Sequence, residues 1–296
     1  MSWAELIRPY EFEFFRNGLY VATIAGALCG VVGCYVVLRN MSYIGHGLSH
    51  SIFGGYAVAG LAGVNLFLGA GIWGVITALA VGGIVRRRPI GSDAAIGVVT
   101  TASFALGLAL VQIYGSPGRN ADALLFGNVL GVTNSDVLLI LGVALATAAI
   151  VFFFYRQLLF TTFDSQVAAA TGVRTAWIDA LLMIVLSATV LATMNVMGVT
   201  LIAATLVVPA VVARMLTDSF GKMLALSAVI GAVSGFVGMN ASYHLDVASG
   251  PTIVLTSACF FIVAYVFGGR FRRRAGSVAH AHCCLLYTSP SPRDEL

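Results

Sequence analysis

The sequence predicts an all-α polytopic membrane protein with about nine transmembrane helices. Of its 296 residues, 59% are hydrophobic and 9% are charged, whereas soluble domains carry roughly 25% charged residues. Apolar runs of about 17 to 25 residues, the length that crosses a bilayer, recur along the chain. We place the spans at residues 18–38, 46–66, 70–85, 94–114, 136–155, 176–194, 198–213, 221–240 and 251–269.

Composition divides the chain into four regions. Residues 1–17 mix charged and aromatic side chains without the basic-then-apolar order of a signal peptide, so we expect an amphipathic segment at the membrane surface. Residues 18–272 are expected to form the transmembrane domain, and residues 273–283 are expected to be a cytoplasmic tail. Residues 284–296 resemble the translation of a sequencing-library adapter, so we expect an artefact there and no retention signal in its last four residues.

Basic residues predict the orientation of the chain in the membrane. Lysine and arginine are concentrated in the connections that follow the odd-numbered spans, for example at Arg39, Arg86 and Arg214. Because these residues accumulate on the cytoplasmic side of membrane proteins, we expect those connections in the cytoplasm. The N-terminus would then lie outside and the C-terminus in the cytoplasm.

Two histidines at the start of the second span form the leading candidate site. His46 and His50 are four residues apart, a spacing that puts both imidazoles on one helix face, where they can share a metal ion. An ionisable residue inside a span is expensive and suggests function. The alternative is that each histidine bonds a backbone carbonyl or reaches the lipid headgroups. We predict a metal site.

A second pair lies in the loop between the last two spans. His244 and Asp246 are two residues apart, on the side predicted to face outward. They are candidate metal ligands at an outer gate. The alternative is that Asp246 and Ser249 cap the last helix just before Pro251, which is the usual work of such residues at a helix start.

The connection between the fifth and sixth spans contains a predicted short helix. It begins at Asp164, a residue type that caps helix starts, continues through alanines that include Ala168, and ends at Gly172. Between two spans, such a helix would lie along the cytoplasmic membrane surface. The sequence contains no Walker A pattern, so we expect neither ATP hydrolysis by this chain nor any other enzyme activity.

Four short motifs occur in one order along the chain and carry a family resemblance. They are MSYIGHGLSHS at 41–51, GSDAAIG at 91–97, LLFGNVLG at 124–131 and YHLDVASGP at 243–251. Over residues 10–272 the sequence resembles the permease subunits of zinc, manganese and iron ABC importers, the ABC-3 family. The resemblance implies a bacterial inner-membrane permease that forms a homodimer or pairs with a homologue. It also implies separate ATPase subunits and an extracytoplasmic metal-binding protein as partners.

The same resemblance assigns roles to the candidate residues. It implies that Asp164, Ala168 and Gly172 belong to a coupling helix that docks on the ATPase subunit, which uses the ATP. Family members usually carry an aspartate where this chain has His46, and two imidazoles favour zinc more than a carboxylate–imidazole pair does. We therefore expect zinc or manganese as the transported ion, no permanently bound cofactor and no nucleic-acid partner.

Two other functions remain open at this point. A permease for a metal chelate, such as a siderophore or haem, predicts a wider cavity lined by aromatic residues in place of paired histidines. A secondary transporter that works alone predicts that the histidines relay protons. The predicted coupling helix argues against a secondary transporter that works alone.

Overall fold

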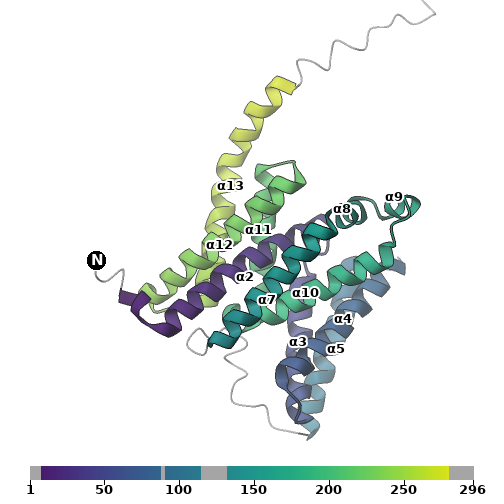
Figure 1. Cartoon of the computed structure of the whole chain (residues 1–296), viewed down its shortest axis with the longest axis vertical. Helices are drawn as coiled ribbons and strands as arrows, with labels where there is room; N and C mark the ends of the chain where they lie inside the picture. The colour runs from purple at the N-terminus through teal and green to yellow at the C-terminus, as the bar shows by residue number, and fades with distance from the viewer. Residues whose placement is uncertain (1–7, 88–90, 115–131, 280–296) are drawn as a thin grey trace, which may run out of the picture.

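The computed structural model describes residues 8–87, 91–114 and 132–279, and Figure 1 shows their arrangement. These residues form the helices η1 (Arg8–Glu11), α2 (Glu13–Leu38), α3 (Ile44–Leu61), α4 (Leu66–Arg87), α5 (Ser92–Tyr114), α7 (Asn134–Phe153), α8 (Tyr155–Phe163), α9 (Ser165–Ala170), α10 (Thr175–Met197), α11 (Ile202–Leu216), α12 (Phe220–Leu245) and α13 (Ser249–Ala279). Within the described ranges there is no strand. The all-α prediction is confirmed. The motif at 124–131 and the segment 284–296 lie outside the described residues.

Every predicted span overlaps a helix, and seven of the described helices are long and apolar enough to cross a membrane. These are α2, α4, α5, α7, α10, α12 and α13. The other two differ for visible reasons. The 18 residues of α3 include two histidines and two serines, and α11 has only 15 residues because Gly198, with φ +77°, follows the end of α10. The count of nine spans stays a prediction.

The long helix α2 lies at the centre of the bundle. It packs along α12 and also contacts α11, α10 and α7 (Figure 1). The approach to α12 is close because glycine faces glycine: a Cβ atom on Gly26 would overlap the backbone of Gly231, and a Cβ on Gly231 would overlap Gly26. Small residues allow such contact between membrane helices. The α2–α12 contact thus forms the frame against which the other helices are placed.

A second group, formed by α3, α4 and α5, joins the bundle through α10 and α11. Here too a glycine permits the contact, because a Cβ on Gly107 of α5 would lie 2.6 Å from the Cα of Gly54 on α3. The helix α3 is therefore held between its own group and the main bundle. The candidate histidines lie on this helix.

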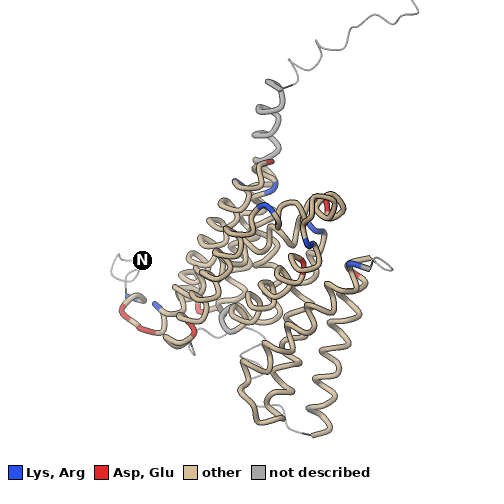
Figure 2. Tube along the Cα trace, turned by 45° about the vertical axis from the view of Figure 1, so that its right-hand side comes forward, with Lys and Arg blue, Asp and Glu red and all other residues tan. Residues whose placement is uncertain are grey.

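The ends of the bundle differ in charge. Figure 2 shows the described lysines and arginines mostly at the end opposite the N-terminus, where α8 and α9 also lie. The last helix extends further than predicted: its apolar part ends at Phe267, and the helix continues to Ala279 through the arginine-rich stretch.

Candidate functional site

The two histidines of α3 face one another. The ring centroids of His46 and His50 are 4.5 Å apart, and the ring planes are 76° apart. An ion about 2.0–2.1 Å from one nitrogen of each ring would place the centroids roughly 5 Å apart, so the observed separation suits a shared ion. The pair occupies the first two turns of α3.

Aromatic rings lie on both sides of the pair, and one histidine nitrogen has no hydrogen-bond partner. The ring of His46 lies 5.3 Å from that of Tyr43, and the ring of His50 lies 5.3 Å from that of Phe104 on α5. The Nδ1 atom of His50 is buried and has no hydrogen-bond partner. Because an unpaired buried polar atom is costly, this nitrogen is a candidate to bind something that enters the site.

The backbone around the pair is held by a serine. The hydroxyl of Ser49 lies 2.8 Å from the carbonyl oxygen of His46 and 2.8 Å from that of Val199, in the turn between α10 and α11. Ser49 is fully buried. This contact ties α3 to the turn between α10 and α11.

The pair offers two imidazoles as candidate metal ligands, and the described residues do not extend it to a larger ligand group. Among the described residues, no group of three or more histidine, cysteine, aspartate or glutamate side chains could hold a metal ion. A four-coordinate ion needs further ligands, which water or a second chain could provide. A site of this kind suits a passing ion better than a structural one.

The second candidate pair lies far from the first. Tyr243 stacks edge-on against Phe15 with centroids 5.2 Å apart, which places the end of α12 beside the start of α2. By contrast, α3 follows the end of α2, a helix of 26 residues and hence about 39 Å long. The structure therefore does not bring His244 and Asp246 together with the α3 pair.

Asp246 and His244 differ from one another in their surroundings. Asp246 ends α12 in the left-handed conformation, with φ 53°, and α13 begins only at Ser249. The backbone of Asp246 thus forms the C-terminal cap of α12, and the alternative that Asp246 and Ser249 cap the last helix stays a prediction. The Nε2 atom of His244 is buried and has no hydrogen-bond partner. A ligand role for this pair stays a prediction.

The short helix predicted after the fifth span is present as α9. The carboxylate of Asp164 accepts bonds from the backbone N–H groups of Gln166 and Val167 at 2.9 and 3.0 Å. At the other end, the N–H of Val173 donates to the carbonyl of Ala168, and Gly172 adopts φ +84°. This is the Schellman ending that glycine permits. The predicted start and stop of the helix are confirmed.

The faces of α9 are unlike one another. Ala168 is fully buried against the protein, whereas Val167 is 54% exposed and Phe163, just before the helix, is 64% exposed. Exposed apolar side chains at the end of a membrane bundle mark a surface that lipid or another protein covers. The role of α9 in docking stays a proposal.

Comparison with known proteins places the chain in a family. The model of the ABC 3 transport family matches residues 11–268. The manganese transport system membrane protein MntC of Halalkalibacterium halodurans is 39% identical over 257 residues, covering 87% of this chain and 88% of MntC. The manganese import system permease protein ScaB of Streptococcus gordonii is 34% identical over 263 residues, covering 89% and 94%. The solved structure of PsaBC from Streptococcus pneumoniae in complex with Fab superimposes with a TM-score of 0.79 at 34% identity, covering 89% and 95%.

The chain belongs to the ABC 3 transport family. The resemblance carried by the four motifs is thereby confirmed. The chain is a multi-pass membrane permease of a bacterial ABC transporter, and the family is a transporter family and not an enzyme family.

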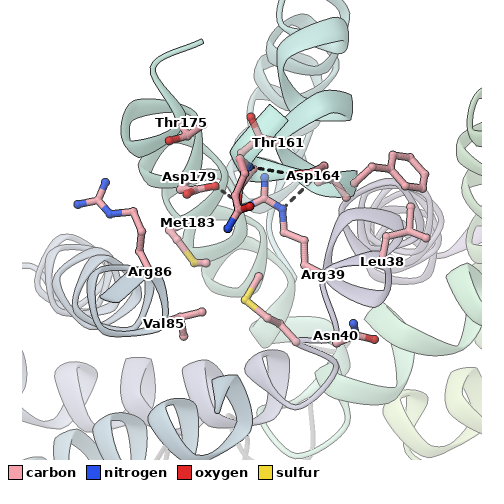
Figure 3. Close-up of a pocket in the computed structure, with 16 residues that line it drawn as sticks. Leu38, Arg39, Asn40, Val85, Arg86, Thr161, Asp164, Thr175, Asp179 and Met183 are labelled. Carbon is pink, nitrogen blue, oxygen red and sulfur yellow. Dashed lines mark hydrogen bonds and ion pairs between the residues drawn. The ribbon is translucent and has the colours of Figure 1, made fainter. Parts of the chain in front are cut away.

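Sequence reasoning missed an ion pair in this ABC 3 family permease. The Nη1 atom of Arg39, at the end of α2, lies 2.6 Å from Oδ1 of Asp179 on α10. Figure 3 shows the two side chains pointing toward one another at one wall of a cavity of about 590 Å³. In the sequence Arg39 directly follows the first predicted span and Asp179 lies at the start of the sixth, but nothing in their spacing shows that residues 140 positions apart meet.

A group of hydrogen-bonded hydroxyls between α3, α4 and α5 was not predicted from the sequence either. The Ser51 hydroxyl lies 2.8 Å from that of Thr77 and 2.6 Å from that of Ser103, and the indole N–H of Trp73 donates to Ser103 at 2.6 Å. Since polar groups in the bilayer must bond internally, this cluster ties the three helices together next to His50.

Proposed function

We propose that this chain is the permease subunit of an ABC importer for a divalent metal ion, and that His46 and His50 bind the ion during its passage. The observation that carries the proposal is the paired imidazoles of α3, 4.5 Å apart, with a buried and unbonded Nδ1 on His50. Neutral imidazoles replace part of the hydration shell of the ion without adding a fixed charge that would trap it.

The incomplete ligand set and the family support a proposed assembly with partner subunits. A second copy, or a homologous permease, would bring further ligands to the ion, since the described part of this chain has no group of three such side chains. ATP would be used by separate ATPase subunits at the end that carries α9, and an extracytoplasmic binding protein would deliver the ion. The N-terminus would lie outside, because the basic residues gather at the α9 end (Figure 2).

Two observations bear on which ion is transported: the names of the relatives and the imidazole at position 46. MntC and ScaB are named for manganese, which supports manganese as a substrate here. Two nitrogen ligands, however, favour zinc over manganese in comparison with one nitrogen and one carboxylate oxygen. We propose that this permease carries zinc relatively better than a variant with aspartate at position 46.

The α9 segment is proposed to couple ATP hydrolysis to transport. Asp164 and Gly172 fix its two ends, and Ala168 anchors it to the bundle. Val167 and Phe163 remain exposed for contact with an ATPase subunit. A secondary transporter that works alone would not need a docking helix, and a permease for a metal chelate would not need the paired imidazoles.

Uptake of radioactive zinc and manganese by membrane vesicles that contain the full transporter tests the proposal. The variant His46→Ala/His50→Ala should lose uptake of both ions while still assembling with the ATPase subunits, as measured by co-purification. His280→Ala, which removes an imidazole from the tail, is the matched control and should transport normally. Normal uptake by the double variant would contradict the proposal.

A further inference from the structure

Arg39 connects three helices at the end of the bundle that carries α9. It terminates α2, its Nη1 is bonded to Asp179 on α10, and its Nε donates to the hydroxyl of Thr162 on α8 at 3.2 Å. The Arg39 side chain is only 10% exposed and that of Asp179 is 21% exposed. A charge pair so shielded from water is screened little and is not easily replaced by solvent.

The two partners of Arg39 stand on either side of the α9 segment along the chain. Thr162 lies at the end of α8, just before Asp164, and Asp179 lies in the second turn of α10, just after the segment. Both flanks of α9 are thus attached to one guanidinium group. A displacement of α9 relative to α2 must strain or break these bonds.

From Arg39 a bonded turn leads directly to the histidines. Asn40 adopts the left-handed conformation with φ 55°, and the N–H of Met41 donates to the carbonyl of Val36 at 3.0 Å. The N–H of Ile44 then donates to the carbonyl of Met41 at 2.9 Å. Because this turn is closed by hydrogen bonds, a shift of Arg39 moves the first turn of α3, where His46 lies.

The surroundings leave room for such a shift. Arg39 and Asp179 line the cavity of about 590 Å³ drawn in Figure 3, whose other walls include Asn40, Arg86, Thr161, Asp164, Thr175 and Met183. The Nη2 atom of Arg39 is buried and lacks a hydrogen-bond partner. A buried donor without an acceptor is unfavourable, so this arrangement of the guanidinium is not its best-bonded one.

We propose that the Arg39–Asp179 pair is the link that transmits movement of the α9 segment to the His46–His50 pair. Arg39 and Asp179 are positioning residues in this proposal, and neither needs to touch the ion. The inference rests on the proposed function, which supplies the coupling role of α9. It adds the path by which ATP hydrolysis changes the geometry of the imidazoles.

The test uses the complete transporter in proteoliposomes, with zinc uptake and ATP hydrolysis measured on the same vesicles. In Arg39→Gln and in Asp179→Asn, zinc taken up per ATP hydrolysed should fall about tenfold, while ATP hydrolysis continues and zinc binding to the permease is retained. The charge-swapped variant Arg39→Asp/Asp179→Arg should recover much of the ratio. Arg86→Gln is the control, because Arg86 lines the same cavity and has no ion pair with any described residue; its ratio should be unchanged.

Two results would overturn the link. One is an unchanged ratio of uptake to hydrolysis in both single variants, and the other is a charge-swapped transporter that assembles but stays as uncoupled as the single variants. If the single variants fail to assemble, Thr162→Val removes only the hydroxyl bond to Arg39. That variant should still lower the ratio, and an unchanged ratio would contradict the proposal.

A companion variant separates this inference from the proposed function. Asp164→Ala removes the carboxylate that caps the start of α9 and leaves Arg39 unchanged. Uncoupling by Asp164→Ala together with normal coupling in Arg39→Gln would refute the Arg39 link alone. Normal coupling in both would refute the coupling role of α9 as well.

Discussion

The histidine pair of α3 and the α9 segment differ in how far the protein satisfies their polar groups. In α9 the start and the end are closed by hydrogen bonds, from Asp164 at one end and through the Gly172 turn at the other. In α3 the Nδ1 of His50 is buried and unbonded. The unbonded Nδ1 supports the proposal that the α3 pair binds a ligand, whereas both ends of α9 are already capped within the protein.

The comparison predicts separable defects. Changes at the histidines should abolish ion binding and spare ATPase contact, whereas changes at α9 should spare ion binding and disrupt the use of ATP. Variants in either region that lose both ion binding and the use of ATP would contradict this distinction between the two regions.

The largest effect in the α9 region is expected from Gly172→Ala. A Cβ atom there meets nothing within 4 Å, so the only cost is the φ of +84°, which residues other than glycine adopt with a penalty of about 1–2 kcal/mol. Zinc uptake per ATP should fall severalfold while zinc binding is unchanged. Gly142→Ala is the matched control, because a Cβ at Gly142 also meets nothing within 4 Å and its φ is not positive. Equal coupling in both variants would show that the Gly172 turn is dispensable.

A smaller effect is expected from His46→Asp, which alters the metal preference and leaves the pair able to bind. Replacing one imidazole by a carboxylate changes a nitrogen ligand to oxygen, and oxygen suits manganese better than nitrogen does. The ratio of manganese to zinc uptake, measured by competition in vesicles, should rise. An unchanged ratio would mean that position 46 does not contact the ion. His50→Ala, tested in parallel, should reduce uptake of both ions.

The smallest effect is expected from the hydroxyl cluster beside the pair. Ser51→Ala removes a buried hydroxyl bonded to Thr77 and Ser103. The free energy of unfolding should fall by about 1 kcal/mol, the usual net value of one hydrogen bond. Thermal unfolding in detergent, with exposed Ser42→Ala as the control, measures it. A loss no larger than that of the control would show that the cluster does not hold α3, α4 and α5 together.

Much of the fold followed from local sequence patterns. Apolar length marked each helix of the bundle, and the capping residues Asp164 and Gly172 marked both ends of α9. Boundaries were less accurate where one residue changed the backbone. The seventh span was predicted from residue 198, but α11 begins at Ile202 because Gly198 takes a positive φ before it.

Only the part of the candidate site that lies on one helix could be predicted from residue spacing. Four-residue spacing on a helix was enough to bring His46 and His50 together. No such rule connects Arg39 with Asp179, or Ser51 with Thr77, because those partners lie on different helices and meet only after the bundle packs. The same limit applies to His244, whose distance from the α3 pair depends on how α12 lies along α2.

The central claim, that His46 and His50 bind the transported ion, is tested most directly by X-ray absorption spectroscopy of the zinc-loaded transporter. His280 and His282 should be replaced by alanine in every sample so that tail imidazoles do not contribute. We predict imidazole nitrogens at about 2.0–2.1 Å from zinc, and loss of this signal in the His46→Ala/His50→Ala variant. The same imidazole signal in the double variant would contradict the account.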